Sequence, residues 1–365
     1  MEDNQKYWIA FNLVFAANLR LAKKIYEYFP SLGEVFKAGK KELLSLGANE
    51  EQAQRIASPR ILDQASKEIE RLERKNYSLL TLEDKEYPPY LREIFDPPYV
   101  LYCAGNVDVL KGPAVSIVGT RKPTPYGRAV AEKLAEDLAS RGLVIVSGLA
   151  RGIDSLAHWG ALKGGQTVAV LGSGLENVYP RECQSLFEKI KETGVVISEF
   201  PLKAPPLGFH FPIRNRIISG LSMALVVVEA AQRSGSLISA RLALEQNREV
   251  MAIPGRVTSD FSQGTNWLIK TGAKLVNTWE DVVEELPSPL KERLLASEEK
   301  KKSLPALKPE EKRIFECLKE DAQTHIDELV EKTDYSVSEL LAVLLNLELK
   351  ELILQNPGKY FQRRW

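Results

Sequence analysis

The chain has 365 residues, 44% of them hydrophobic and 27% charged, a composition typical of a soluble globular protein with room for two or three domains. Its 49 basic and 49 acidic side chains cancel to a formal net charge of +0, so any nucleic-acid binding must come from a local basic patch. The polar start is unlike a signal peptide and the sequence has no apolar run long enough to span a bilayer, so we expect a cytoplasmic protein that does not bind membranes.

The N-terminal part of the chain has helical spacing of apolar residues and no strand signals, which predicts an all-α domain over residues 1–75. Within it, residues 44–56 resemble a helix-hairpin-helix, a module that often grips a DNA backbone through hairpin N–H groups. The hairpin has one glycine, Gly47, and is followed by Glu50 and Glu51, which would repel phosphate. We therefore favour a structural role for this hairpin over DNA binding.

The central part, residues 76–286, begins with a stretch rich in proline, 76–112, where we expect an extended connector with a short strand at 99–103. After it, short apolar runs alternate with helical patterns. Strands are predicted at 114–118, 143–146, 167–171, 195–198, 224–228 and 250–253. Helices are predicted at 126–140, 155–162, 183–191, 237–246 and 265–271. This alternation predicts an α/β fold with a doubly wound, mainly parallel sheet and right-handed crossovers.

The C-terminal part is predicted to be a charged linker over residues 287–308 followed by a winged helix over residues 309–365. Ser336 and Glu339 form a capping box that opens the presumed recognition helix. That helix is mostly leucine and has no arginine or lysine within it, whereas a DNA-reading helix is expected to be basic or rich in amides. We expect it to contact protein, or to contact a DNA backbone only weakly.

Polar residues and glycines follow the predicted strands of the central domain. They are Gly119-Thr120-Arg121, Ser147-Gly148, Gly172-Ser173-Gly174, Glu199 and Glu229. Because the carboxyl ends of parallel strands share one edge of a sheet, these residues should converge. The segment from Ser147 to Asp154 offers free N–H groups and Arg151 at that edge, which predicts a phosphate site, with Asp154 as a helix cap.

Two arginines, Arg214 and Arg216, flank Asn215 after the fourth strand of the central domain. The aromatic side chains just before them are Phe209, His210 and Phe211. Arginines for phosphates together with aromatic rings for base faces are typical of single-strand nucleic-acid binding. The alternative is that these arginines pair inside the fold with acids, namely Glu199, Glu229 or Asp154.

A serine-glycine-serine turn, Ser234-Gly235-Ser236, precedes the helix predicted at 237–246. It is suited equally to a phosphate and to a plain helix cap. His158 is expected to be a packed or surface side chain rather than a base.

Sequence motifs of common enzyme classes are missing. There is no glycine fingerprint for a dinucleotide after the first strand, no phosphate-binding lysine loop and no serine elbow. No metal or cofactor is expected, because the histidines and cysteines have no ligand spacing, and Cys103, Cys183 and Cys317 are predicted to be buried free thiols. A hydrolase that uses Glu199 or Glu229 as its acid–base group stays open.

These motifs together resemble the DprA/Smf family of bacterial DNA-processing proteins, and the resemblance covers nearly the whole chain. It is densest in Gly119-Thr-Arg, Ser147-Gly-Leu-Ala-Arg-Gly-Ile-Asp154, Phe211-Pro-x-Arg-Asn-Arg-Ile-Ile-Ser-Gly220, Glu229-Ala, Ser234-Gly-Ser-Leu-Ile-Ser-Ala240, Pro254-Gly255 and Gly264-Thr-Asn-x-Leu-Ile269. So many motifs in one order are far more specific than a general Rossmann pattern.

The resemblance implies an extended Rossmann-like domain between a SAM or helix-hairpin-helix domain and a winged helix. It also implies a non-enzymatic homodimer that binds single-stranded DNA without base specificity, protects incoming strands and loads a RecA-type recombinase in natural transformation. Carried over by motif, the DNA-binding residues are Gly119, Thr120, Arg121, Ser147, Gly148, Arg151, Phe211, Arg214, Asn215, Arg216, Ser234, Gly235 and Ser236.

Two alternatives differ in class from this expectation. One is a nucleotide phosphoribohydrolase acting at the same sheet edge, a group that carries Pro-Gly-Gly-x-Gly-Thr-x-x-Glu. Here the corresponding residues run from Glu229 to Leu237 and lack the acid after the glycine turn, which argues against it. The other is a structural adaptor, whose binding of recombinase would survive the loss of the pocket arginines.

Overall fold

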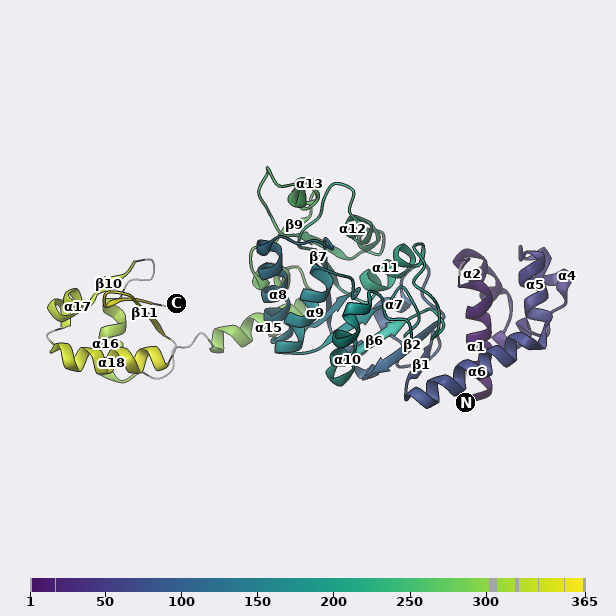
Figure 1. Cartoon of the computed structure of the whole chain (residues 1–365), viewed down its shortest axis with the longest axis horizontal. Helices are drawn as coiled ribbons and strands as arrows, with labels where there is room; N and C mark the ends of the chain where they lie inside the picture. The colour runs from purple at the N-terminus through teal and green to yellow at the C-terminus, as the bar shows by residue number, and fades with distance from the viewer. Residues whose placement is uncertain are drawn as a thin grey trace. The chain divides into compact units, whose positions relative to one another are not determined.

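The computed structural model describes residues 2–16, 18–301, 307–318, 322–333, 335–350 and 352–363. The chain divides into two compact units, Met1–Leu294 and Leu295–Trp365. Figure 1 shows the helical region and the large sheet of the first unit, and the small helical and β unit at the C-terminus.

Six helices form the N-terminal region. They are α1 (Glu2–Phe15), α2 (Leu19–Tyr28), α3 (Leu32–Val35), α4 (Lys40–Ser45), α5 (Glu50–Ala57) and α6 (Pro59–Lys75). In the hairpin between α4 and α5, Asn49 and Gln52 cap each other, and the amides of Gly47 and Ala48 donate to carbonyls of α4. The hairpin amides are therefore used internally, in agreement with the structural role favoured above.

The central sheet has nine strands in the order β1-β2-β6-β5-β4-β3-β7-β8-β9. The strands are β1 (Ser78–Thr81), β2 (Val100–Gly105), β3 (Ala114–Val118), β4 (Val144–Ser147), β5 (Thr167–Val170), β6 (Val195–Ser198), β7 (Ala224–Val227), β8 (Glu249–Ala252) and β9 (Lys274–Leu275). All neighbours from β6 to β9 are parallel, which confirms the extended Rossmann-like, doubly wound sheet. Since β3 lies between β4 and β7, the winding direction of the chain reverses there, and ligands bind at such a switch point.

The proline-rich stretch 76–112 contains the strand predicted at 99–103, which is β2, but it holds more regular structure than the extended connector that was expected. It contributes two strands, because β1 pairs antiparallel with β2 and β2 pairs antiparallel with β6, and it also forms the short helix α7 (Pro89–Arg92). A four-residue strand such as β1 is too short for its alternation to be recognised beside a proline cluster.

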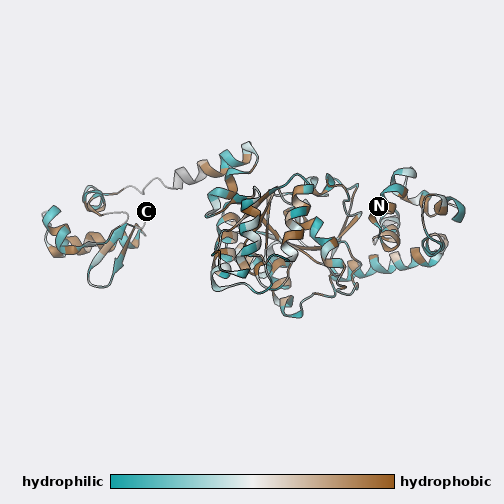
Figure 2. Cartoon of the chain, turned by 90° about the horizontal axis from the view of Figure 1, so that it is seen from above, coloured by the Kyte–Doolittle hydropathy of each residue, from teal (hydrophilic) through white to brown (hydrophobic). Residues whose placement is uncertain are grey.

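Eight helices follow in the first unit and the segment after it. They are α8 (Pro125–Ala139), α9 (Ile153–Gly164), α10 (Gln184–Thr193), α11 (His210–Gly220), α12 (Gly235–Glu245), α13 (Gln263–Lys270), α14 (Trp279–Glu284) and α15 (Ser288–Lys301). Figure 2 shows hydrophobic and hydrophilic residues mixed along these helices, as expected for helices with one buried side. Helix α11 was not predicted, since aromatics and Pro212 obscure its start, although proline is tolerated in a first helical turn. Helix α15 occupies much of the stretch 287–308 that was interpreted as a linker.

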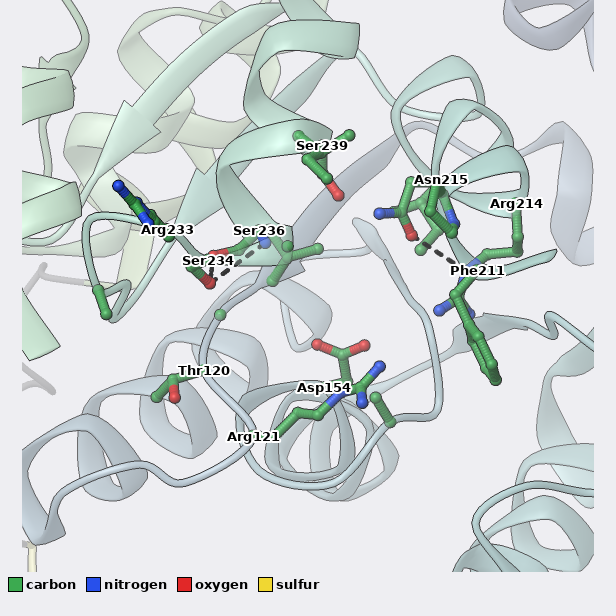
Figure 3. A pocket seen from close by; sticks show the side chains of 18 of the residues that line it. Thr120, Arg121, Asp154, Phe211, Arg214, Asn215, Arg233, Ser234, Ser236 and Ser239 are labelled. Atoms are coloured by element: carbon green, nitrogen blue, oxygen red, sulfur yellow. Dashed lines mark hydrogen bonds between the residues drawn. The ribbon is translucent and has the colours of Figure 1, made fainter. Parts of the chain in front are cut away.

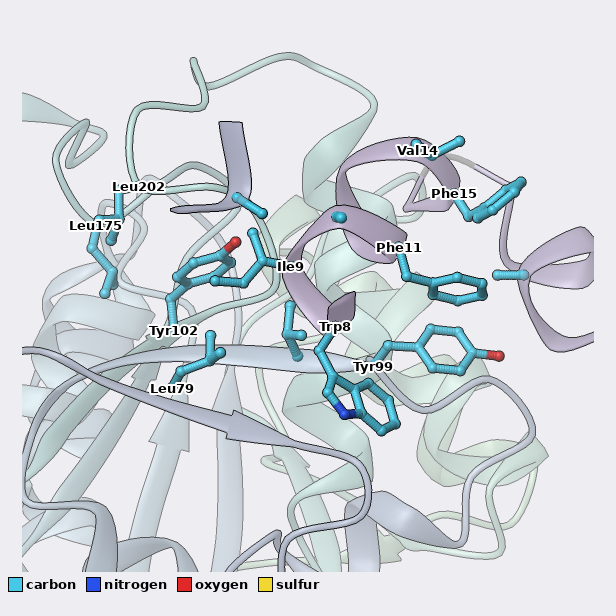
Figure 4. Close-up of a cluster of buried hydrophobic side chains, with 14 of the residues drawn as sticks. Trp8, Ile9, Phe11, Val14, Phe15, Leu79, Tyr99, Tyr102, Leu175 and Leu202 are labelled. Atoms are coloured by element: carbon cyan, nitrogen blue, oxygen red, sulfur yellow. The ribbon is translucent and has the colours of Figure 1, made fainter. Parts of the chain in front are cut away.

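One hydrophobic cluster joins the helical region to the sheet (Figure 4). Side chains of α1, including Trp8 and Phe11, pack with Tyr99 and Tyr102 beside and within β2. Two polar contacts reinforce this packing: the Asn12 amide donates to the Glu199 carbonyl at 2.8 Å, and Glu68 Oε2 accepts from the Leu202 N–H at 3.0 Å. The helical region is thus fixed to the carboxyl end of β6.

His158 on α9 is fully buried and has a defined tautomer. The Thr167 hydroxyl donates to the Ile145 carbonyl at 2.6 Å, so His158 Nδ1, 2.7 Å from the same hydroxyl, must donate to it. Nε2 is then unprotonated and has no hydrogen-bond partner among the described residues. Burial lowers the pKa of His158 to about 3 because protonation would bury a charge.

Acidification is expected to destabilise the first unit through His158. The side chain titrates near 6.5 when unfolded and at about 3 when folded, so below pH 6.5 the unfolded state binds a proton that the folded state does not. From pH 7 to pH 5 this group should remove about 2 kcal/mol from the free energy of unfolding. Urea unfolding at both pH values should therefore show a larger loss in the wild type than in His158→Gln; equal losses would contradict the assignment.

In the second unit, the described residues from 307 onward form three helices and a three-stranded sheet of order β10-β12-β11, the arrangement of a winged helix. Its elements are α16 (Pro309–Cys317), β10 (Thr324–His325), α17 (Ile326–Thr333), α18 (Val337–Leu349), β11 (Ile353–Asn356) and β12 (Tyr360–Arg363). The predicted capping box of Ser336 and Glu339 opens α18. The solvent-facing side of α18 carries Leu341, Leu345 and Leu349 and no cation, which agrees with the expectation that this helix does not read DNA.

Among the described helices, none combines the length and the apolar character that crossing a membrane would need. The cysteines are unpaired; Cys103 and Cys183 are buried as expected, whereas Cys317 is only partly buried.

Candidate nucleic-acid interface

A pocket of about 870 Å³ opens at the carboxyl edge of the sheet. The loops after β3 and β7 form one part of its wall, and helices α11 and α12 form another (Figure 3). This is the switch point of the sheet, where the sequence predicted that the strand ends would meet.

Three cations, Arg121, Lys122 and Arg233, line the pocket with exposed side chains. None of them forms an ion pair with a carboxylate in the part of the chain that the structure describes. The guanidinium carbon of Arg121 lies 5.8 Å from the centroid of the Phe211 ring. These cations are thus available to an anionic ligand beside an aromatic surface. Lys122 and Arg233 were not predicted, although each adjoins a predicted motif.

The loop that carries Arg121 is fixed at Thr120 by two backbone hydrogen bonds. Thr120 N–H donates to the Glu229 carbonyl at 2.8 Å, and the Thr120 carbonyl accepts from Ile153 N–H at 3.2 Å. A Cβ on Gly119 would lie 2.6 Å from the Ile153 side chain, so glycine is needed for the loop to approach α9. Gly119 and Thr120 therefore line the pocket and hold Arg121 at its mouth.

The turn before α12 faces the same pocket. The Ser234 hydroxyl caps the helix by accepting from the Ser236 N–H at 3.3 Å, and the two hydroxyls lie 2.7 Å apart. A Cβ on Gly235 would meet nothing within 4 Å, so the space in front of this helix N-terminus is open. Both roles considered for Ser234, Gly235 and Ser236 are therefore compatible with the geometry.

Arg214 also lines the pocket, but its guanidinium already donates hydrogen bonds to groups of the protein. Its Nη1 donates to the carbonyls of Gly148, at 2.6 Å, and Val170. Burial lowers the pKa of Arg214 to about 10, a shift that nearby Asp154 opposes, so the side chain stays cationic at neutral pH. A Cβ on Gly148 would lie 2.6 Å from Nη1, and this position therefore requires glycine. Asn215 also lines the pocket and accepts from Arg214 Nε at 3.2 Å.

Asp154 supports this floor of the pocket and does not cap the helix as expected. Gly152 is the N-cap of α9, and Asp154 Oδ2 instead accepts from the Gly148 N–H of the preceding turn at 3.2 Å. Burial raises the pKa of Asp154, and the Arg214 charge opposes that rise. The opposite charges of Asp154 and Arg214 thus compensate each other at the floor of the pocket.

Three predicted side chains point into the fold instead. Arg216 is buried; its Nη2 donates to Glu199 Oε2 at 2.6 Å and its Nε lies 3.3 Å from Asp96 Oδ2. The Ser147 hydroxyl is buried and donates to the Ile117 carbonyl at 2.7 Å. The structure therefore does not bring Arg216 or Ser147 to the pocket. His210 is stacked on Phe200 with ring centroids 4.0 Å apart, which leaves it unavailable to a base.

A second, smaller recess of about 50 Å³ adjoins the pocket. Arg151 lines it and forms an exposed ion pair with Glu182, in which Nη2 donates to Oε2 at 2.8 Å. Tyr179 also lines both hollows, with its ring centroid 5.8 Å from that of Phe211. Tyr179 was not predicted from the sequence, since its ring is brought to Phe211 only by folding.

The acids of the site are engaged in structural contacts. Glu229 accepts from the Thr124 N–H at 2.9 Å and the Thr124 hydroxyl at 2.5 Å, beside the start of α8, and Glu199 is held by Arg216. Among the described residues that line the pocket, Asp154 is the one carboxylate, so no pair of acids is available for general acid–base catalysis. Nor do the described residues contain a His, Cys, Asp or Glu cluster suited to a metal.

Comparison with known proteins gives matches over most of the chain. The family model for DNA recombination-mediator protein A matches residues 78–287, and that for the DprA winged helix domain matches residues 298–359. Protein Smf of Escherichia coli K12 is 40% identical over 304 residues, covering 80% of this chain and 79% of that protein.

Two solved structures support the same relationship. The X-ray structure of DNA processing protein A from Streptococcus pneumoniae has a TM-score of 0.65 and 36% identity, covering 77% of this chain and 98% of that one. DNA processing protein A from Helicobacter pylori, described for its single-stranded DNA binding mode, has a TM-score of 0.53 and 33% identity, covering 60% of this chain and 96% of that one.

Proposed function

The chain belongs to the DNA recombination-mediator protein A family, also known as DprA or Smf, and on that premise we propose that it binds single-stranded DNA without base specificity. The pocket at the sheet edge holds the strand. Arg121, Lys122 and Arg233 neutralise its phosphates, the turn before α12 donates hydrogen bonds, and Phe211 stacks on a base.

The observation that carries this proposal is the set of three exposed cations that form no ion pair among the described residues, beside the half-buried ring of Phe211. A nucleotide hydrolase would need an acid and a base over its ligand, but both Glu199 and Glu229 are committed to structural contacts. Arg121, Lys122 and Arg233 can contact phosphates whatever the base sequence, which supports binding directed at the backbone of the strand.

Fluorescence anisotropy with single-stranded and duplex oligonucleotides of mixed sequence, at two salt concentrations, tests the proposal. Single strands should bind more tightly than duplex, with little dependence on base sequence and with affinity that falls as salt rises. Equal binding of duplex, or affinity independent of salt, would contradict it. Release of base from nucleoside monophosphates would instead favour the hydrolase.

The family's description as a recombination mediator supports a further part of the proposal: the protein acts in the cytoplasm, where it protects incoming strands and loads a RecA-type recombinase onto them. Recombinase filament formation on coated single strands, followed with and without the protein, measures this. An adaptor would still recruit recombinase after Arg121→Ala, whereas a strand-binding mediator should not load it.

We also propose a homodimer through the outer face of α12 and α13. Leu244 and Trp267 are exposed there, 60% and 55%, and border a largely apolar hollow of about 380 Å³. Because buried aromatic anchors dominate interface energies, Trp267→Glu should raise the dimer dissociation constant by about 30-fold or more. Analytical ultracentrifugation measures it. Tyr28→Glu, at an equally exposed aromatic (56%), is the control, and an unchanged dimer in Trp267→Glu would reject this face.

A further inference from the structure

We propose that Tyr179 and the Arg151–Glu182 pair form a second nucleotide subsite beside the pocket, and that Glu182 limits strand binding by competing with DNA phosphate for Arg151. The inference rests on the proposed single-strand binding function and extends it. A strand that fills the main pocket would continue into the recess, where Tyr179 receives the next base and Arg151 the next phosphate.

The pocket and the recess share part of their walls. Arg121, Ala150, Tyr179 and Phe211 line both the pocket and the recess, while Arg151 lines only the recess. Successive nucleotides need positive charge and aromatic surface to alternate along such a path. Both kinds of group are present: Arg121 lies beside the Phe211 ring, that ring adjoins Tyr179, and Arg151 lines the same recess as Tyr179.

Tyr179 offers a ring face to a base. Its side chain is 46% exposed, and its ring is tilted by 52° to Phe211 at 5.8 Å between centroids. Rings at this tilt do not stack on each other, so they form a bent ledge with two surfaces rather than one closed pair. The ledge suits two neighbouring bases of a strand and not a base held between the rings.

Glu182 is paired with Arg151, the cation that the second phosphate would bind. Arg151 and Glu182 are 60% and 53% exposed and joined by two hydrogen bonds, so water and salt screen their attraction and a phosphate can reach Arg151. A phosphate offers Arg151 the same forked geometry with more charge. Glu182 lies in a short 3-10 helix (Arg181–Cys183) that begins directly after Pro180. Glu182 and Tyr179 therefore belong to one loop, and a bound strand would affect both.

The aromatic part is tested with Tyr179→Ala and the control Tyr28→Ala. Anisotropy would be recorded with oligothymidylates, with thymidine monophosphate as competitor, and with an oligonucleotide of abasic residues. Loss of one stacked base should weaken oligothymidylate binding between about fivefold and a hundredfold, with no change for the monophosphate or the abasic strand. An equal loss for the abasic strand, or no loss for oligothymidylate, would overturn the subsite.

The acidic part is tested with Glu182→Gln and the control Glu188→Gln, which removes a negative charge of equal exposure, 53%, from the pair with Lys191. Glu182→Gln should tighten strand binding and steepen the plot of log affinity against log salt by about 0.7, the value for one more phosphate contact on a single strand. Adding Arg151→Ala should remove both effects. A gain shared by Glu188→Gln, or one that survives Arg151→Ala, would overturn the competition.

The outcomes separate this inference from the function on which it rests. Thermal unfolding confirms that each variant is folded. If the wild type does not bind single strands, the proposed function and the subsite both fail. If the wild type binds, but Tyr179→Ala and Glu182→Gln behave like their controls, the subsite alone fails.

Discussion

Arg121→Ala is expected to weaken single-strand binding by about 10- to 100-fold, uniformly across sequences. A hydrogen bond to a charged group contributes about 1.5 to 3 kcal/mol, and Arg121 forms no ion pair with any described carboxylate, in contrast to Arg151, although the charge of Asp154 acts on it from the pocket floor. The loop contacts of Thr120 already hold the backbone at the pocket mouth, so little ordering is needed on binding. The dependence of log affinity on log salt should become shallower by about 0.7.

Anisotropy titrations at several salt concentrations measure both effects. Lys133→Ala is the control, since this exposed cation of α8 pairs with Asp137 and does not line the pocket. Arg121→Lys should restore the salt dependence and only part of the affinity, because an ammonium cannot bind phosphate through two parallel hydrogen bonds. Unchanged affinity and salt dependence in Arg121→Ala would remove Arg121 from the site.

Arg216→Ala is expected to lower the free energy of unfolding by about 3 to 5 kcal/mol. The substitution leaves the Glu199 carboxylate buried without its cation, and breaking a buried pair in this way costs far more than breaking an exposed one. Arg151→Ala provides the exposed counterpart, for which a much smaller loss is expected because water screens the pair. Denaturant unfolding of both variants measures the contrast.

The double variant Arg216→Met/Glu199→Leu refines the assignment. Removing both charges together should recover most of the stability that Arg216→Ala loses, since the fully buried carboxylate is removed with its cation and only the more exposed Asp96 (31%) loses a partner. If Arg216→Ala keeps its stability but loses DNA binding, Arg216 contacts phosphate after all, as the sequence suggested.

The strands and the shared sheet edge could be predicted from the sequence because each apolar run is short, buried and followed by a polar turn. The different positions of Arg214 and Arg216 could not, because helix α11 was not recognised. Side chains two residues apart share one face of an extended segment, but they point about 200° apart around a helix. Arg214 therefore turns to the pocket floor and Arg216 to Glu199.

The residues missed in the site share another cause. Tyr179 lies far from Phe211 in sequence, and Lys122 and Arg233 stand out only because they line the pocket without an ion pair among the described residues. Whether a cation has an ion-pair partner depends on the whole fold, and no local sequence pattern indicates it. The winged helix was easier, since a capping box and a proline-glycine turn mark its elements.

The hydrophobic cores of the two units determine where this protein can be divided into parts that fold independently. Side chains of α1 such as Trp8 and Phe11 belong to the same core as β2 and β6, whereas the C-terminal unit has a core entirely its own, centred on Leu340, Leu344 and Phe361. Because the two units have separate cores, cleavage of the chain between them can leave two intact folds. The N-terminal helices are not detachable in this sense, since their loss would expose apolar side chains of β2 and β6 that belong to the same core.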